Sequence, residues 1–166
     1  ASIRTQQKKG SLLWTLDETK TAMGGRMLKQ WLEKPLINLS DILERQRKVE
    51  SLVNHYFERM DINDALTSVY DLERLVARVS LGNINGRDLI QLKTSLQQIP
   101  GLVQAIAAID EPDVWQAVID KLEAYPEVIE LIERAITDNP PIQITEGNII
   151  RDGYHEQLDR YRDAMN

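Results

Sequence analysis

The sequence contains no cysteine. This absence excludes disulfide bonds, thiol nucleophiles and thiolate metal sites, and it is typical of a protein that works in a reducing compartment. Aromatic residues are also few, at 5% of the chain, and neither a fixed-period repeat nor a low-complexity tract is present. The chemistry of the chain must therefore come from other side chains, or the chain has a structural role.

Long apolar runs are lacking as well. No stretch approaches the roughly 18 residues that a membrane-spanning helix requires, and no charged, apolar and small-residue signal peptide opens the sequence. We therefore expect a cytoplasmic protein without a membrane partner. The net charge of -6 also argues against a surface made mainly for nucleic-acid phosphates or anionic lipid.

What the sequence does contain is helical periodicity. With 42% apolar and 28% charged residues, the 166-residue chain has the composition of a globular domain with a core. Apolar residues recur at helical spacing in seven segments, which are residues 21–32, 41–53, 71–80, 85–99, 112–122, 126–136 and 153–166. Pro100 and Gly101 are expected to end the fourth segment. The fold class is therefore all-α, an irregular multi-helix bundle with one short extended or hairpin segment near 142–150 and a truncated long C-terminal helix.

Several helix ends carry capping residues. Thr21 and Asn85 are placed to cap the helices that follow them, and Ser40 or Asp41 is expected to cap another. Gly82 follows an apolar helical segment and suits a C-terminal cap. These signals predict where the helices begin and end.

Signals for catalysis are weak. His55 and His155 are the only histidines, and neither has a second ligand at metal spacing, so we interpret both as surface or capping residues. The carboxylates Asp110, Glu111 and Asp113 suit a solvated helix start. Neither a phosphate loop nor a nucleophile elbow is present. We predict no catalytic, cofactor-binding or metal residue in this chain.

Three stretches of the chain occur in an order that is found in one known family. They are KKGSLLWTLDETKTAMGGRMLKQWLEKPL (residues 8–36), VYDLERLVARVSLGNINGRDL (69–89) and NPPIQITEGNIIRDGYHEQLDRYR (139–162). The first resembles, almost residue for residue, the start of the core (lever) domain of the bacterial MutS mismatch-repair ATPases. The other two agree with later parts of that domain, and the resemblance covers essentially the whole chain.

The resemblance implies a domain organisation. Residues 1–152 correspond to the MutS-like core (lever) domain, and residues 153–166 to the start of the long helix that leads toward a clamp domain. The polar start of the chain and its last helix without a stop signal are then expected, because the chain would be a piece of a longer protein.

The resemblance also implies a function. In the parent protein the lever couples the state of the ATPase to DNA clamping and mismatch recognition, so this segment is expected to be structural, allosteric and not an enzyme. ATP and Mg²⁺ are expected to bind the parent elsewhere. The expected partners are the connector, clamp and ATPase domains of the parent chain and, through the parent, mismatched duplex DNA. The parent is expected to be a homodimer.

Two adjacent glycines raise the question of packing. Gly24 and Gly25 fall within a helical pattern, where each costs about 1 kcal/mol relative to alanine. We interpret them as a place where a neighbouring helix approaches the backbone closely, although a frayed first turn would also tolerate them. With these two glycines, the residues predicted to make interhelical or relay contacts are Gly24, Gly25, Trp31, Gly153, Tyr154, Leu158 and Tyr161. Core positions are expected for Trp14, Trp31 and Trp115.

Two other classes of function stay open at this point. A free-standing helical adaptor would bind a partner protein through one groove, but finished termini would be expected of it. A helical enzyme with an acidic site would need clusters of paired polar motifs, which the sequence does not display. A screen of metals and nucleotides for a thermal shift separates the enzyme from the other two.

Overall fold

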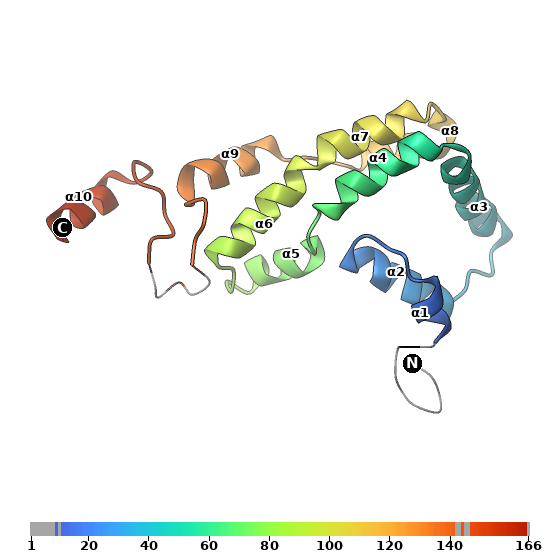
Figure 1. The fold of residues 1–166 in the computed structure, drawn as a ribbon, viewed down its shortest axis with the longest axis horizontal. Helices are drawn as coiled ribbons and strands as arrows, with labels where there is room; N and C mark the ends of the chain where they lie inside the picture. Colours follow the sequence, from blue (N-terminus) through green and yellow to red (C-terminus); the bar gives the residue numbers. More distant parts are fainter. Residues whose placement is uncertain (1–8, 10, 142–143, 145–146, 166) are drawn as a thin grey trace. The chain divides into compact units, whose positions relative to one another are not determined.

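The structure is a computed structural model that describes residues 9, 11–141, 144 and 147–165 (Figure 1). Helices dominate it, which confirms the expected all-α class. Within the described residues the helices are α1 (Leu12–Leu16), α2 (Ala22–Glu33), α3 (Leu39–Asn54), α4 (Tyr56–Thr67), α5 (Leu72–Ser80), α6 (Gly86–Gln97), α7 (Ile99–Ala108), α8 (Pro112–Asp120), α9 (Pro126–Ala135) and α10 (Glu156–Met165). No helix in this described part is both long and apolar enough to cross a membrane.

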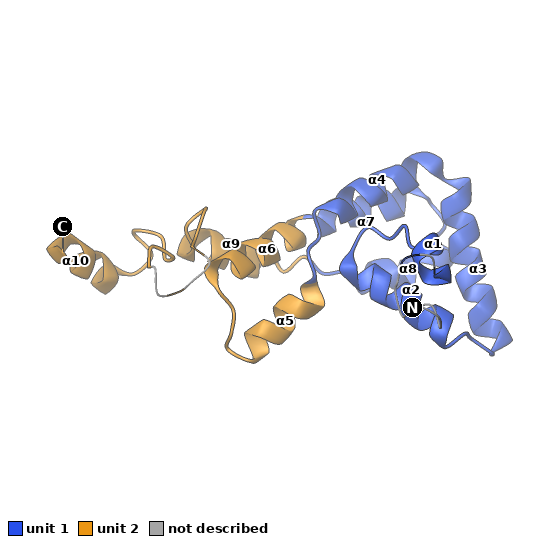
Figure 2. Ribbon diagram, turned by 60° about the horizontal axis from the view of Figure 1, so that its bottom comes forward, with its two compact units in different colours: residues 1–71, 98–123 blue, residues 72–97, 124–166 orange. Residues whose placement is uncertain are grey.

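The chain divides into two compact units (Figure 2). Unit 1 comprises Ala1–Asp71 and Gln98–Glu123, and unit 2 comprises Leu72–Gln97 and Ala124–Asn166. Each unit is thus assembled from two separate parts of the sequence. The division that the resemblance implies, at 152/153, stays a prediction.

The core of unit 1 is formed by helices α3, α4, α7 and α8. Helix α4 packs along α7, while α8 contacts both α7 and α3. Four buried side chains form the centre of this core, and they are Leu102, Ile106, Ile109 and Trp115. Helix α4 contributes Ile62, Ala65 and Leu66 from its inner side. It is not among the helices that periodicity predicts, because its apolar residues form no clear stripe.

The core of unit 2 lies between α6 and α9. Ile132, Ala135 and Ile136 are buried there, against Leu89 and Leu92 of α6 among others. Helix α5 packs on α6. Its contribution is Leu75, whose side chain is completely buried.

The predicted extended segment near 142–150 is described only in part, because residues 142–143 and 145–146 lie outside the described residues. At its end, Ile150 forms an isolated antiparallel bridge with Ile136, directly after α9. The described part therefore pairs with the end of a helix.

The expected caps are present at three positions. The Thr21 hydroxyl accepts the Gly24 N–H at 2.9 Å, and the Asn85 side chain accepts the Asp88 N–H at 2.8 Å. Gly82 adopts a φ of 68°, the left-handed conformation that ends helix α5. Short-range capping signals were therefore reliable at these positions.

Two other helix boundaries differ from the expectation. Helix α3 is capped by Asn38, whose side chain accepts the N–H groups of Ser40 and Asp41, so these two residues lie inside the first turn. Helix α6 ends at Gln97, close to the expected stop, but Pro100 and Gly101 lie in the first turn of the next helix, α7, and not in a loop. Proline is compatible with this position because the first N–H groups of a helix have no partner within the helix.

Only one of the three tryptophans occupies the core. Trp115 is 8% exposed, whereas Trp14 is 54% and Trp31 38% exposed. The prediction of core positions for Trp14 and Trp31 is therefore wrong for the chain as described. An apolar stripe shows which face of a helix a residue is on, but not whether another element covers that face.

Candidate relay contacts

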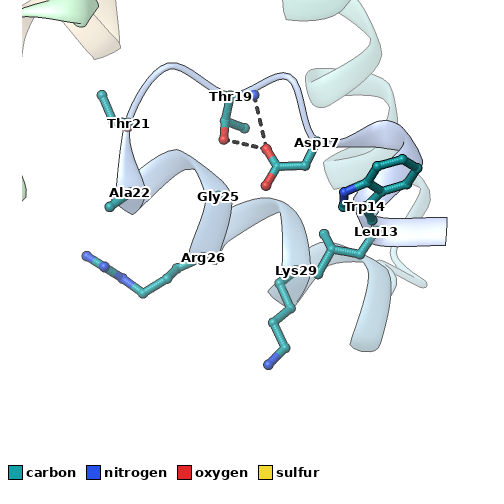
Figure 3. Close-up of a pocket in the computed structure, with 9 residues that line it drawn as sticks. All are labelled: Leu13, Trp14, Asp17, Thr19, Thr21, Ala22, Gly25, Arg26 and Lys29. Atoms are coloured by element: carbon teal, nitrogen blue, oxygen red, sulfur yellow. Dashed lines mark hydrogen bonds between the residues drawn. The ribbon is translucent and has the colours of Figure 1, made fainter. Parts of the chain in front are cut away.

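The loop between α1 and α2 folds back onto α2 beside Gly25 (Figure 3), and Gly24 precedes this residue on the same helix. Asp17 organises this loop, because its carboxylate accepts both the backbone N–H and the hydroxyl of Thr19. Thr21 then caps α2. A pocket of about 440 Å³ opens at this corner, and it is lined by Leu13, Trp14, Asp17, Thr19, Thr21, Ala22, Gly25, Arg26 and Lys29.

The loop approaches both glycines closely. A Cβ atom at Gly24 would lie 3.1 Å from the Thr21 hydroxyl oxygen, and one at Gly25 would lie 3.3 Å from the Thr19 hydroxyl oxygen and 3.5 Å from a carboxylate oxygen of Asp17. Among the described residues, the element that occupies the space beside the two glycines is therefore this loop and not a second helix. The interhelical role of Gly24 and Gly25 stays a prediction.

Larger side chains at these glycines are expected to be costly. Gly24→Leu or Gly25→Leu should lower the free energy of unfolding by about 1 kcal/mol, because displacing the loop outweighs the better helix propensity of leucine. Urea titration of each variant measures the effect, and Gly101→Leu is the control, since nothing lies within 4 Å of a Cβ there. Stabilisation by both α2 substitutions would contradict this account of the glycines.

Helix α2 is attached to the rest of unit 1 partly through polar contacts. The Arg26 guanidinium forms two hydrogen bonds of 2.8 Å with the two carboxylate oxygens of Asp71. The guanidinium of Arg45, on α3, lies 3.8 Å from the ring centre of Trp31, which is a cation–π contact. The predicted relay residue Trp31 therefore joins α2 to α3.

A buried polar group connects α3 with the start of α8. Trp115 Nε1 donates to the Ser51 hydroxyl at 2.8 Å, and that hydroxyl donates to Glu111 Oε1 at 2.9 Å. His55 Nδ1 lies 2.7 Å from the Ser51 carbonyl oxygen and 3.4 Å from the same Glu111 oxygen. Because the members come from distant parts of the chain, sequence spacing gave no sign of this cluster.

In unit 2 the buried carboxylate of Asp88 is surrounded by donors. The residue is 5% exposed. Arg78 Nε lies 2.8 Å and Arg74 Nη1 3.6 Å from its two oxygens, and the Asn85 N–H donates to it at 3.2 Å. Buried carboxylates are stable only when they are paired in this way. The cluster therefore fixes α5 to the start of α6.

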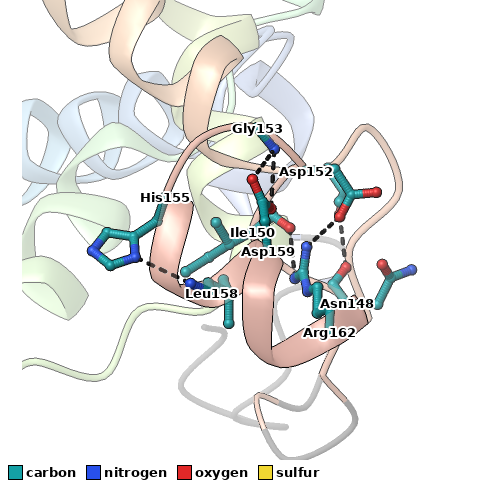
Figure 4. Close-up of polar contacts among 9 residues, drawn as sticks. Asn148, Ile150, Asp152, Gly153, His155, Leu158, Asp159 and Arg162 are labelled. Carbon is teal, nitrogen blue, oxygen red and sulfur yellow. Dashed lines mark hydrogen bonds and ion pairs between the residues drawn. The ribbon is translucent and has the colours of Figure 1, made fainter. Parts of the chain in front are cut away.

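The last four predicted relay residues lie in α10 or just before it, and Figure 4 shows two of them, Gly153 and Leu158. The helix begins at Glu156, so Gly153 and Tyr154 precede it, and the expectation of a helix from Gly153 onward is wrong by about one turn. The φ of Gly153 is 84°, a conformation that glycine favours and that is incompatible with a right-handed helix. Leu158 is half-buried, and Tyr161 is exposed.

The two histidines have capping positions, as expected. His55 is the residue between α3 and α4. His155 Nδ1 accepts the N–H of Leu158 at 3.3 Å and so caps the first turn of α10. Within the described residues, no cluster of three or more histidine or acidic side chains is arranged to hold a metal ion.

The carboxyl group of Asp138 has a shifted pKa. A hydrogen bond and the charge of Arg151, 2.6 Å away, hold the pKa of Asp138 below its usual value of 3.8. Because the pKa is lowered in the folded state, the contribution of this pair to stability is present at neutral pH. It is lost as the pH falls below the unfolded value and through the folded one.

Comparison with known proteins identifies the family. The sequence model of MutS domain III matches residues 1–165. The chain is 54% identical over 163 residues to the DNA mismatch repair protein MutS of Bacillus subtilis (strain 168) and to that of Geobacillus sp. (strain WCH70), and 50% identical over 165 residues to that of Halalkalibacterium halodurans. Each comparison covers 98% of this chain and 19% of the relative. Since the match extends over nearly all of its residues, the chain belongs to the MutS domain III family.

Proposed function

We propose that this chain is the lever segment of a DNA mismatch-repair protein of the MutS type. The observation that carries the proposal is the identity of 54% with relatives named DNA mismatch repair protein MutS, over 98% of the chain. Because the chain spans about a fifth of the length of these relatives, its role is that of one part in a longer protein.

The contacts within the chain support a mechanical role. Helices transmit displacement when polar contacts fix them to their neighbours, and the pairs Arg26–Asp71, Trp31–Arg45 and Arg78–Asp88 are contacts of this kind. We infer that the segment relays the state of a distant ATPase to a DNA clamp, and DNA occupancy back to the ATPase. Such coupling is reciprocal in binding free energy.

The proposed partners are other parts of the same protein. They are the connector, clamp and ATPase domains of the parent chain and, through them, mismatched duplex DNA. ATP and Mg²⁺ would bind the ATPase domain, the parent would act as a homodimer in the cytoplasm, and this chain itself would catalyse nothing.

The chain by itself is therefore expected to bind neither ATP nor mismatched DNA selectively. Its net charge of -6 disfavours phosphate contacts, and the guanidinium groups of Arg26 and Arg78 are paired with carboxylates. A mobility-shift titration should give equal, weak binding to a G·T mismatch and to a matched duplex, whereas specific binders exceed non-specific binding by about 10³-fold or more. A clear preference for the mismatch would overturn this expectation.

The relay itself can be tested only in the longer protein. There, Gly25→Leu is expected to slow the ATP-triggered release of mismatched DNA while the affinities for ATP and for the mismatch stay unchanged, because the substitution disturbs the loop on α2 and no ligand site. Gly101→Leu is the matched control, since it lies in open space. Unchanged release by the Gly25 variant would contradict a relay through α2, and a loss of ATP binding would point to a different role.

A further inference from the structure

The segment before α10 is tied to the end of α9. The N–H of Thr137 donates to the Ile149 carbonyl and the N–H of Arg151 to the Ala135 carbonyl, both at 2.7 Å. On the same segment, the Thr137 hydroxyl donates to the carbonyl of Asn148 at 2.9 Å. The Arg151 guanidinium adds the ion pair with the carboxylate that follows α9. Residues 148–151 are therefore held to the core of unit 2 by backbone and side-chain contacts together.

A second set of contacts ties α10 to the next residues of the same segment (Figure 4). Gly153 N–H donates to both carboxylate oxygens of Asp159, at 3.1 and 3.0 Å. Arg162 Nη1 donates to Asp152 Oδ1 at 2.6 Å, and Arg162 Nη2 donates to the Ile150 carbonyl at 2.8 Å. Two side chains of α10, one helical turn apart, thus point back onto the chain that enters the helix.

The Arg162 side chain holds two groups of the preceding segment at once. The planar guanidinium bonds a carboxylate and a backbone carbonyl at once, which fixes its orientation in a way that a single ammonium contact does not. The Asp152 side chain is 88% exposed, whereas the Arg162 side chain is 28% exposed and its bond to the Ile150 carbonyl is partly buried. The carbonyl it binds belongs to Ile150, the residue that is bridged to the end of α9. Arg162 therefore links α10 to the part of the segment that is itself fixed to the core.

We propose that residues 148–153 form a stiff elbow and that Arg162 is the positioning residue that sets the direction of α10 relative to α9. The significance of this direction rests on the proposed lever function, because a lever transmits motion only if the helix that leaves it keeps a fixed angle. The elbow itself is a property of this chain, and its test requires neither ATP nor DNA.

Distances between spin labels test the elbow directly. The chain has no native cysteine, so Glu127→Cys on α9 and Ala164→Cys on α10 give two labels and no background. Both positions are exposed. The unmodified elbow should give one narrow distance distribution. Arg162→Ala should broaden it, and should make the amides of α10 exchange up to about fivefold faster, the factor expected for a partly exposed charged pair.

The matched control is Arg160→Ala. Arg160 is on the same helix and pairs with Glu156, four residues earlier, but its side chain is 74% exposed and this ion pair lies within α10. This variant should keep the narrow distribution. If Arg162→Ala leaves the distribution unchanged, or if Arg160→Ala broadens it equally, the proposal is overturned.

A second variant guards against simple unfolding of α10. Arg162→Lys keeps the charge on the helix, but its ammonium cannot hold the Asp152 carboxylate and the Ile150 carbonyl in the fixed plane of a guanidinium. If Arg162→Ala lowers the helix content, Arg162→Lys decides the question, since broadening with full helix content supports the positioning role of Arg162 and a narrow distribution refutes it. Failure of the relay experiment with Gly25→Leu would leave this result standing, so the two proposals fail separately.

Discussion

Replacing Trp115 by alanine is expected to lower the free energy of unfolding by about 3–5 kcal/mol, the range for a buried aromatic residue truncated to alanine. Trp115 is 8% exposed and belongs to the central cluster of unit 1. Its removal would leave a cavity against Leu102, Ile106 and Ile109, which cannot all move to fill it. Urea titration followed by far-UV circular dichroism measures the change.

The indole N–H adds a smaller contribution that a second variant isolates. Trp115→Phe keeps most of the apolar volume but removes the hydrogen bond to the Ser51 hydroxyl. The free energy of unfolding should fall by about 1 kcal/mol because of the lost hydrogen bond, and by a further amount because the phenyl ring is smaller than the indole. The Ser51 hydroxyl keeps its contact with Glu111 in this variant, so only one polar group changes its environment.

Trp31→Ala is the control for the same chemical change at an exposed site. Trp31 is partly exposed on α2, and its described ring contact is with the guanidinium of Arg45, worth about 0.5–1 kcal/mol at such a site. The loss should therefore be several-fold smaller than that of Trp115→Ala. Equal losses in the two alanine variants would show that the core of unit 1 is not centred on Trp115.

Local features of the sequence predicted most of the helices but not α1 and α4. The capping positions of Thr21, Gly82 and Asn85 depend on contacts within three or four residues, and such contacts can be recognised from spacing alone. The positions of Pro100 and of Asn38 were harder, because a proline can end one helix or begin the next, and several polar residues in a row can each serve as a cap.

Burial and long-range contacts could not be predicted in the same way. Trp14, Trp31 and Trp115 all lie on apolar faces, and only the packing of other helices distinguishes them. The hydrogen bond from Trp115 to Ser51 spans 64 residues of sequence, and the ion pair of Arg26 with Asp71 spans 45. No spacing rule connects residues at such separations.

The candidate relay residues illustrate the same limit. Gly24 and Gly25 were recognisable because they are unfavourable within a helix, but the sequence did not indicate that the preceding loop approaches them. Arg162 and Asp152 lie in the third stretch that resembles the family, residues 139–162. Arginine on a helix surface and aspartate in a loop are nevertheless ordinary, so nothing in the sequence marked them. Their pairing depends on how the segment before α10 lies beside the helix, and this is seen only in the structure.

Gly86→Ala gives the second large effect, an expected loss of about 1–3 kcal/mol. Gly86 is the buried first residue of α6, and a Cβ there would lie 2.6 Å from Cβ of Pro140 and 3.0 Å from Cγ2 of Ile149. A proline ring cannot rotate away, so the segment after α9 would have to shift as a whole. The higher helix propensity of alanine offsets little at the first position of a helix.

Gly101→Ala is the matched control, because it makes the same change on α7 where nothing lies within 4 Å of the new Cβ. It should stabilise the chain by about 0.5–1 kcal/mol through reduced backbone entropy in the unfolded state. Urea titration should therefore give shifts of opposite sign for the two glycines. A stabilising Gly86→Ala would mean that the start of α6 and Pro140 are not in close contact in solution.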